Sequence, residues 1–315
     1  MLSNPLISIV IPIYNKEFWV NETLNSVLNQ SYKNWECLII NDGSTDQSLD
    51  IVLAFTEKHP ANWMIETITN SGQSYARNLG IKLATGAYIA FLDADDLWHP
   101  DKLKSQIDLF ISNPALELVL SPYVIFREKQ IAGFRLVRNR NPRKLVGDWL
   151  SMRGFGGLIE SAGMVKRETL VNLGNFSNEL SMAAGLDLCL RIVNSRPSSI
   201  APQPHVFYRL SDMQYHKNED FLISDLAIVS DEHSNSREIL DKLKVGHTNY
   251  LYWSHTRSFG RLEFMKRTLL AILAFDVPKL TMLYFLIGRN VMALYKGALR
   301  HYQIQSFLRT HRIKG

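Results

Sequence analysis

The sequence predicts an α/β fold with a mostly parallel central sheet, followed by a helical C-terminal region. Short apolar runs of strand length alternate with amphipathic helical segments up to about residue 112, as in repeated strand–helix–strand units. From about residue 219 the apolar spacing is that of helices alone. We therefore expect one α/β domain over residues 1–218, with halves of about 1–112 and 113–218, and a helical region over 219–315.

The composition is that of a globular protein. Of the 315 residues, 46% are hydrophobic and 21% are charged, and the formal net charge is +5. A mildly basic chain suits a phosphorylated substrate, an anionic membrane surface or nucleic acid, so charge alone selects no partner. Cys37 and Cys189 are the only cysteines, so no disulfide framework is indicated. The N-terminal residues show no basic segment followed by a long apolar one, so we expect no secretory signal and a cytoplasmic protein.

Four strands and four helices are expected in the first half. The strand segments are apolar and β-branched, and the helical segments carry apolar residues on one face. The expected strands are residues 7–13, 35–40, 64–67 and the apolar run from 88. The expected helices are one ending near Gln30 with Asn15 as its cap, one capped by Asp46, one over residues 74–84 and one beginning at Pro100.

The fourth strand runs into a cluster of acids, Asp93-Ala94-Asp95-Asp96. Open α/β sheets bind ligands at the carboxyl ends of their strands. Carboxylate oxygens suit Mg²⁺ or Mn²⁺, and such an ion in turn suits a diphosphate. The alternative is a solvated acidic turn that caps the next helix.

Other polar segments follow the other strands of the first half. Right-handed crossovers bring the loops after parallel strands to one edge of the sheet. We therefore expect Tyr14-Asn15, Asp42, residues 70–78 and the acid cluster to converge there.

Four motifs in a fixed order carry a family resemblance. They are Pro12-x-Tyr14-Asn15, then Asn41-Asp42-Gly43-Ser44-Thr45-Asp46, then Asn70-x-Gly72-x-x-x-Ala76-Arg77-Asn78-x-Gly80, and then Asp93-Ala94-Asp95-Asp96 with Pro100-Asp101-Lys102-Leu103. The ordered set resembles the family 2 glycosyltransferases of the GT-A fold, over roughly residues 6 to 210.

The resemblance implies a nucleotide-sugar site built from these motifs. Asp42 resembles the aspartate that accepts a hydrogen bond from the nucleotide base, although it could instead be an Asx-turn residue. Pro12 and Tyr14 would line the base and ribose pocket, with Asn15 beside them. Tyr14 could equally be a core aromatic residue.

The resemblance also implies a divalent metal ion, Mn²⁺ or Mg²⁺, at the acid cluster. Asp95 would ligate the metal, Asp93 would contact ribose or metal, and Ala94 between them would border the nucleotide sugar. Asp96 would anchor the loop or cap a helix. Arg77 would pair with a phosphate or hold the acid loop in place, unless it is a surface arginine.

The implied reaction moves a sugar from a nucleotide diphosphate sugar, a UDP-sugar above all, to a glycan or lipid-linked acceptor. The metal neutralises the charge that develops on the leaving diphosphate, and a base accepts the proton of the acceptor hydroxyl. Members of this type generally invert the anomeric configuration. Their commonest setting is the synthesis of bacterial surface polysaccharide or lipopolysaccharide, and no nucleic-acid partner is expected.

The expected catalytic base departs from the family pattern. Many members have a Glu-Asp pair ahead of a helix of the form Asp-Leu-Trp-Leu-Arg. Here the helix reads Asp187-Leu188-Cys189-Leu190-Arg191, but Ala184-Gly185 falls where the pair would be. Three readings stay open: Asp187 is the base, Glu179 replaces it, or the base is absent. For Asp187 the structural alternative is a helix cap or an ion pair with Arg191 at i+4.

The last segment of the chain is basic and partly apolar. No acidic residue follows Asp276, whereas seven basic residues do. Apolar faces with charge of one sign suit a helix lying on an anionic leaflet. We expect residues 277–315 to attach the protein peripherally to the inner face of the cytoplasmic membrane. The alternatives are a helical cap on the catalytic domain and a homodimer interface.

Two other functions compete with the transferase. A nucleotidyltransferase also uses acids at strand ends, but it usually needs a glycine-rich loop with a basic residue near the N-terminus, and residues 9–16 offer none. A catalytically impaired sugar-nucleotide-binding or scaffold protein of the same fold would account for the Ala184-Gly185 departure.

Overall fold

The computed structural model describes residues 4–127, 130–135, 160–181 and 183–209, together with Asp225, Ile228 and Val229. The chain divides into two compact units, Met1–Gly246 and His247–Gly315. All described residues belong to the first unit. The expected helices and basic face of the C-terminal region, residues 277–315 included, lie outside the described residues.

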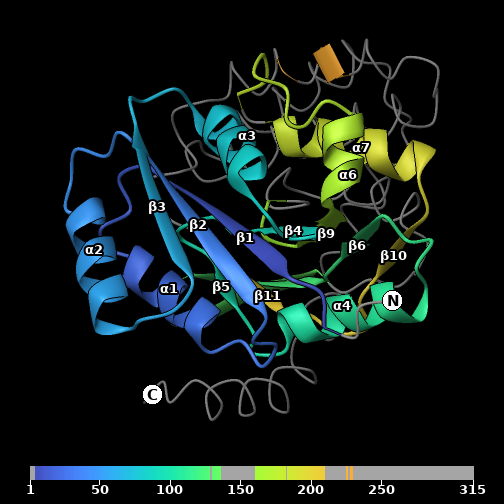
Figure 1. The fold of residues 1–315 in the computed structure, drawn as a ribbon, viewed down its shortest axis with the longest axis horizontal. Helices are drawn as coiled ribbons and strands as arrows, with labels where there is room; N and C mark the ends of the chain where they lie inside the picture. The colour runs from blue at the N-terminus through green and yellow to red at the C-terminus, as the bar shows by residue number, and fades with distance from the viewer. Residues whose placement is uncertain are drawn as a thin grey trace, which may run out of the picture. The chain divides into compact units, whose positions relative to one another are not determined.

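A seven-stranded sheet forms the centre of the described part of the chain (Figure 1). β1 pairs in parallel with β2 and with β4, and β2 pairs in parallel with β3. β9 runs antiparallel to both of its neighbours, β4 and β6. The order across the sheet is β10 (Ser198–Ile200), β6 (Leu118–Leu120), β9 (Gly163–Lys166), β4 (Tyr88–Phe91), β1 (Ile7–Ile13), β2 (Trp35–Asp42) and β3 (Trp63–Ile68).

Helices cover both faces of this sheet. In Figure 1, α3, α6 and α7 lie on one side, and α1, α2 and α4 lie on the other. Their bounds are α1 (Val20–Leu28), α2 (Ser48–Lys58), α3 (Gln73–Leu83), α4 (Lys102–Ser112), α6 (Arg167–Asn172) and α7 (Ala184–Ser195). Within the described residues, no helix is both long and apolar enough to cross a membrane.

The central strands are apolar because both of their faces are buried. Every residue of β1 and β2 is buried, as expected for strands covered by helices on both sides. α3 lies so close to β1 that a Cβ on Gly80 would fall 2.3 Å from Cγ1 of Val10. Glycine at this position therefore allows the helix that carries Arg77 to approach the sheet.

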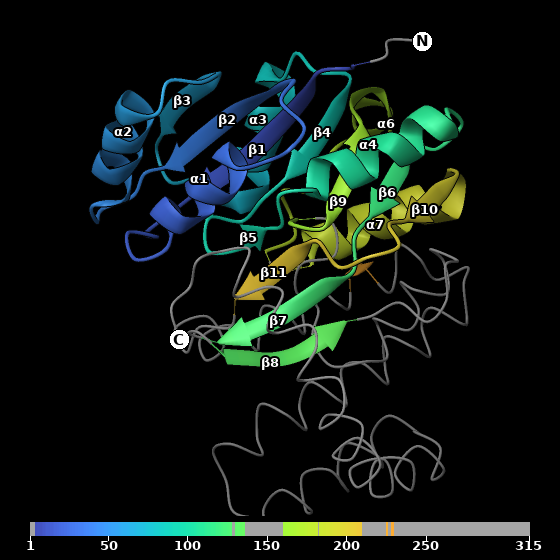
Figure 2. The ribbon, with the colours of Figure 1, turned by 90° about the horizontal axis from the view of Figure 1, so that it is seen from below.

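A second, four-stranded sheet lies beyond the carboxyl ends of the central strands (Figure 2). Its order is β5 (Leu97–Trp98), β11 (Val206–Arg209), β7 (Tyr123–Arg127) and β8 (Gln130–Arg135). β11 runs antiparallel to β5 and parallel to β7. Since β5 directly follows the acid cluster, this pairing brings a strand of the second half of the chain to the predicted site.

The predicted elements agree closely with the structure, with differences at helix starts. The strand over residues 7–13 is confirmed to the residue, and the mostly parallel sheet is confirmed. The helix predicted to begin at Pro100 begins at Lys102 instead, with Asp101 as its N-cap residue. α1 likewise begins at Val20, and Asn15 does not cap it. The carbonyl oxygen of Pro100 accepts a hydrogen bond from the amide of Ser31, which holds this turn outside the helix.

Stability between pH 4 and 6.5 is expected to depend on His205, just ahead of β11. Burial, followed by the neighbouring His99, lowers the pKa of His205 from 6.5 to about 4, despite the opposing charge of Asp101. In this pH range the unfolded chain binds the proton more readily than the folded one, so the folded state loses stability as the pH falls from 6.5 towards 4. In the variant His205→Gln, urea unfolding at several pH values should show less of this loss. An equal loss in both proteins would contradict the assignment.

Candidate functional site

The loops that follow β1, β2, β3 and β4 meet at one edge of the sheet. The four strands run parallel in adjacent positions, so their carboxyl ends point the same way. The ammonium of Lys16, after β1, lies 2.6 Å from Oδ2 of Asp95, after β4. The amide of Lys16 also donates to Oγ of Ser48, at the start of α2. The predicted convergence of the four loops is therefore present.

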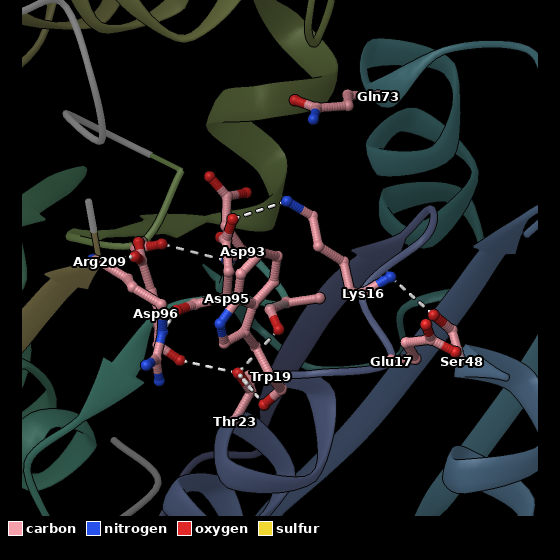
Figure 3. A network of polar contacts seen from close by, with 12 residues as sticks. Lys16, Glu17, Trp19, Thr23, Ser48, Gln73, Asp93, Asp95, Asp96 and Arg209 are labelled. Atoms are coloured by element: carbon pink, nitrogen blue, oxygen red, sulfur yellow. Dashed lines mark hydrogen bonds and ion pairs between the residues drawn. The ribbon is translucent and has the colours of Figure 1, made fainter. Parts of the chain in front are cut away.

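The loop of the acid cluster, residues 93–96 (the acid loop), is hydrogen-bonded through its backbone to α1. Oγ1 of Thr23 lies 2.9 Å from both the carbonyl oxygen of Ala94 and that of Asp96. Ala94 itself is buried. Figure 3 shows Thr23 beneath the loop, with Lys16 reaching the acids from one side and Arg209 from the other. The loop is thus held through its backbone, which leaves its carboxylates to face cations.

Asp93 is held by Arg77 of α3. Nη2 of Arg77 donates to Oδ1 of Asp93 at 2.6 Å, and the arginine side chain is only 4% exposed. The central carbon of the guanidinium lies over the ring of Phe176, 5.4 Å from its centroid. Arg77 thus contacts the acid loop, and its pairing with a phosphate stays a prediction.

Asp96 anchors the loop to the second sheet. Its Oδ1 accepts the amide hydrogen of Arg209 at 2.9 Å, while Nε of Arg209 donates to the carbonyl oxygen of Asp95 at 2.7 Å. Burial, followed by the charges of Asp95 and Asp93, raises the pKa of Asp96 well above its ordinary value. A buried carboxyl group with a raised pKa suits an anchor of the loop better than a metal ligand.

Asp42 organises the turn that leads into α3. Its Oδ1 accepts the amide hydrogen of Ser71 at 2.6 Å, and its Oδ2 accepts that of Gly72 at 2.9 Å. Gly72 has a φ of +92°, a conformation that side chains disfavour. Each carboxylate oxygen can accept a second hydrogen bond. These contacts therefore hold Asp42 in position, and its oxygens could still accept a hydrogen bond from a nucleotide base.

The residues of the first motif sit at the edge of this site. Pro12 is buried within β1. Tyr14 is 43% exposed, so it is not a core aromatic residue. Asn15 has a φ of +53°, which asparagine tolerates, and its Oδ1 accepts the amide hydrogen of Thr45 at 2.8 Å. Asn15 thereby joins the loop after β1 to the loop after β2.

The two predicted candidates for the base differ in their surroundings. Oδ2 of Asp187 accepts hydrogen bonds from Nε and Nη2 of Arg191 at 2.9 and 2.7 Å. This is the i+4 pairing named as its structural alternative. Arg191 also donates to the carbonyl oxygens of Leu173 and Asn175. Through Arg191, Asp187 therefore takes part in holding α7 against the turn that follows α6. Glu179 is exposed.

Sequence reasoning gave no site role to several residues that the structure places here, among them Lys16, Thr23 and Ser161. Oγ of Ser161 accepts the amide hydrogen of Asp93 at 3.1 Å, and its carbonyl oxygen accepts Nε1–H of Trp98 at 2.9 Å. Lys16 directly follows the motif Pro12-x-Tyr14-Asn15, so its place in the sequence could have indicated a position in the site. Thr23 and Ser161 act through backbone contacts, and no local pattern marks them.

The donor set of the acid loop fits a hard divalent cation. Asp93 and Asp95 offer carboxylate oxygens, and both already face positive groups, Arg77 and Lys16. No cage of three or more protein ligands is found among the described residues. Mg²⁺ and its relatives are commonly held by one or two carboxylates together with substrate phosphates, so two carboxylates suffice for such a site.

Removing the guanidinium of Arg77 is expected to destabilise the fold. The substitution Arg77→Met would leave Asp93 without its close cationic partner. Breaking a buried pair typically costs about 3–5 kcal/mol, and we expect about 2–3 kcal/mol because Asp93 is partly exposed to solvent. Urea unfolding measures the loss. Lys104→Met, which breaks an exposed pair with Asp108, is the control and should change stability by less than about 0.5 kcal/mol. Equal effects of the two variants would contradict the structural role of Arg77.

Comparisons with known proteins agree with this geometry. The family model "Glycosyl transferase family 2" matches residues 8–165, half of the chain. An uncharacterised glycosyltransferase of Haemophilus influenzae is 44% identical over 112 residues, which cover 36% of this chain and 45% of that protein. The Escherichia coli protein UDP-Glc:alpha-D-GlcNAc-diphosphoundecaprenol beta-1,3-glucosyltransferase WfgD is 37% identical over 131 residues, covering 41% of this chain and 49% of that one. The chain thus spans about half the length of these relatives.

A solved structure shows the same fold. The mannosyltransferase PcManGT from Pyrobaculum calidifontis, in complex with GDP-Man and Mn²⁺, superposes with a TM-score of 0.61 at 19% identity, covering 99% of this chain and 87% of that one. Together with a family match over half of the chain and a site whose motifs meet at one sheet edge, this likeness settles the assignment: the chain belongs to glycosyltransferase family 2 and has the GT-A fold.

Proposed function

We propose that the protein transfers a sugar from a UDP-sugar to a glycan or lipid-linked acceptor in the assembly of a cell-surface polysaccharide. The observation that carries this proposal is the meeting of Asp42, Arg77, Asp93, Asp95 and Lys16 at one edge of the sheet. The name of the Escherichia coli relative, which specifies a UDP-Glc donor and a diphosphoundecaprenol-linked acceptor, supports the choice of substrates.

The nucleotide base and the diphosphate of the donor would bind at different parts of the site. Asp42, fixed by the amides of Ser71 and Gly72, would accept a hydrogen bond from the nucleotide base, with Pro12, Tyr14 and Asn15 bordering the same pocket. The diphosphate would then extend towards the acid loop, where Lys16 contributes a positive charge.

A divalent ion, Mn²⁺ or Mg²⁺, would be held by Asp95 and Asp93. Such an ion supplies stabilisation of the negative charge that develops on the leaving diphosphate. The protein's own contribution is positional: Thr23 holds the backbone of the acid loop, and Arg77 holds the carboxylate of Asp93. The presence of Mn²⁺ in the structure of the Pyrobaculum calidifontis mannosyltransferase supports the use of a divalent metal.

The reaction would be a single inverting displacement. The acceptor hydroxyl would attack the anomeric carbon on the face opposite the diphosphate, while the bond between that carbon and the diphosphate oxygen breaks. A carboxylate on the acceptor side must take the hydroxyl proton. The impaired or scaffold alternative differs from this proposal only in lacking that carboxylate.

Metal-dependent release of UDP tests the proposal. Purified protein with Mn²⁺ would be given UDP-glucose or UDP-N-acetylglucosamine, with octyl glycosides or an undecaprenyl-diphosphate-linked sugar as acceptors. We expect acceptor-dependent UDP release, and a fall of about 100-fold or more in Asp95→Asn, because one removed electrostatic contact costs roughly that factor. Asp108→Asn, at an exposed position on α4, is the matched control. A native protein that binds UDP but releases none would favour the scaffold function.

We also propose a domain boundary near residue 218. A separate proposal is that residues 277–315 attach the protein peripherally to the cytoplasmic face of the membrane. The support is the one-sign charge of this segment, with seven basic and no acidic residues after Asp276. Lipid-linked acceptors, which the Escherichia coli relative's name specifies, would be reached from that surface.

Flotation with liposomes containing anionic lipid tests the attachment. The full chain should float with the liposomes, and a chain lacking residues 277–315 should remain at the bottom of the gradient. Liposomes of neutral lipid are the control and should bind less. Unchanged binding after the deletion would place the attachment elsewhere or exclude it.

A further inference from the structure

The missing side chain at Gly185 leaves a space that another carboxylate fills. A Cβ on Gly185 would lie 1.9 Å from Oε1, 2.1 Å from Cδ and 2.5 Å from Oε2 of Glu160. Contacts this short are incompatible with any side chain at position 185 unless Glu160 moves. The carboxylate of Glu160 therefore occupies the place into which a residue at position 185 would project, in the first turn of α7.

Glu160 is joined to the acid loop through its neighbour in the chain. Ser161 accepts the amide hydrogen of Asp93 and the indole hydrogen of Trp98, so the backbone that carries Glu160 is fixed beside the acids. The charge of Glu160 also reaches Arg77. Burial would lower the pKa of Arg77, but Asp93, then Glu160, raise it above its ordinary value. Glu160 thus lies close to the arginine that holds Asp93.

The carboxylate of Glu160 lies beside the first turn of α7 and is shielded from bulk water. The helix dipole favours a negative charge at the N-terminus of α7, a helix of 12 residues, where a carboxylate oxygen of Asp225 also accepts the amide hydrogen of Ala183. The residue is buried, which keeps bulk water from competing for an acceptor hydroxyl. By contrast, Oδ2 of Asp187 is held by Arg191, and Glu179 is exposed.

Resting on the proposed glycosyl transfer, we propose that Glu160 is the catalytic base, and that its carboxylate takes over the position left empty by Gly185. As the acceptor oxygen forms its bond to the anomeric carbon, the hydroxyl proton passes to a carboxylate oxygen of Glu160. The electron pair of the breaking carbon–oxygen bond leaves with the diphosphate. Atoms and charge balance without a further reactant. Glycine at position 185 is then a requirement of the site, since any side chain there would displace the base.

The variant Glu160→Gln tests this assignment. It keeps the shape of the side chain but cannot accept the proton. We expect kcat for acceptor-dependent UDP release to fall by about 10²–10⁴-fold, the usual contribution of a general base. The affinity for UDP with Mn²⁺, measured by calorimetry, should stay within about twofold. The decline of kcat at low pH, which reports protonation of the base, should also disappear.

Two further variants separate catalysis from structure. Glu160→Ala combined with Gly185→Asp returns a carboxylate to the same space from the other chain segment, and it should recover part of the lost rate. Glu168→Gln, at an exposed position on α6, is the matched control and should behave as the native protein does. If Glu160→Gln does not fold, Glu160→Asp is measured instead and should lower kcat while keeping the decline at low pH.

The outcomes distinguish this inference from the proposed function. Native protein that releases no UDP with any donor and acceptor overturns the function itself, and the inference with it. Native protein that is active while Glu160→Gln has an unchanged rate overturns the inference alone. The inference is also overturned if Glu160→Gln is slower but keeps the native decline at low pH, or if Glu160→Asp, measured in its place, has the native rate.

Discussion

The site depends on how three carboxylates in four consecutive residues are held in a largely buried loop. Asp93, Asp95 and Asp96 would repel one another at close range in a medium of low dielectric. In the structure each carboxylate has a different partner, which reduces this repulsion. Asp93 faces Arg77, Asp95 faces Lys16, and Asp96 is buried against the amide of Arg209 with its pKa raised. Two of the acids thus face cationic side chains, and the third is a buried anchor of the loop.

The fixed loop in turn determines how the rest of the chain is arranged. Its backbone is bonded to Thr23 of α1, to Ser161 ahead of β9 and to Arg209 of β11. These contacts join the two halves of the α/β unit at one place. In the proposed function the backbone of the acid loop would need little rearrangement, and such preorganisation is what makes electrostatic stabilisation effective in catalysis.

The proposed role of Glu160 would keep a function although the usual motif is absent. The usual acidic pair is replaced by Ala184-Gly185, which read alone suggests an impaired enzyme. In three dimensions the same glycine creates the space that the carboxylate of Glu160 fills. The chemistry of a proton acceptor requires a carboxylate at a given point in space, and it does not require that the carboxylate come from a given segment of the chain.

The sequence by itself determined the fold class, the order of the motifs and the edge of the sheet at which they meet. These follow from local periodicity and from the handedness of crossovers, so Asp42, Asp93 and Asp95 could be placed before any coordinates were known. Only the tertiary structure decided which groups pair with them. Lys16 and Asp95 are separated by 79 positions and Arg209 and Asp96 by 113, and no local pattern encodes such contacts. The pairing of Asp187 with Arg191 was foreseeable as an i+4 contact. The approach of Glu160 to Gly185 was not, because it depends on packing between separate segments.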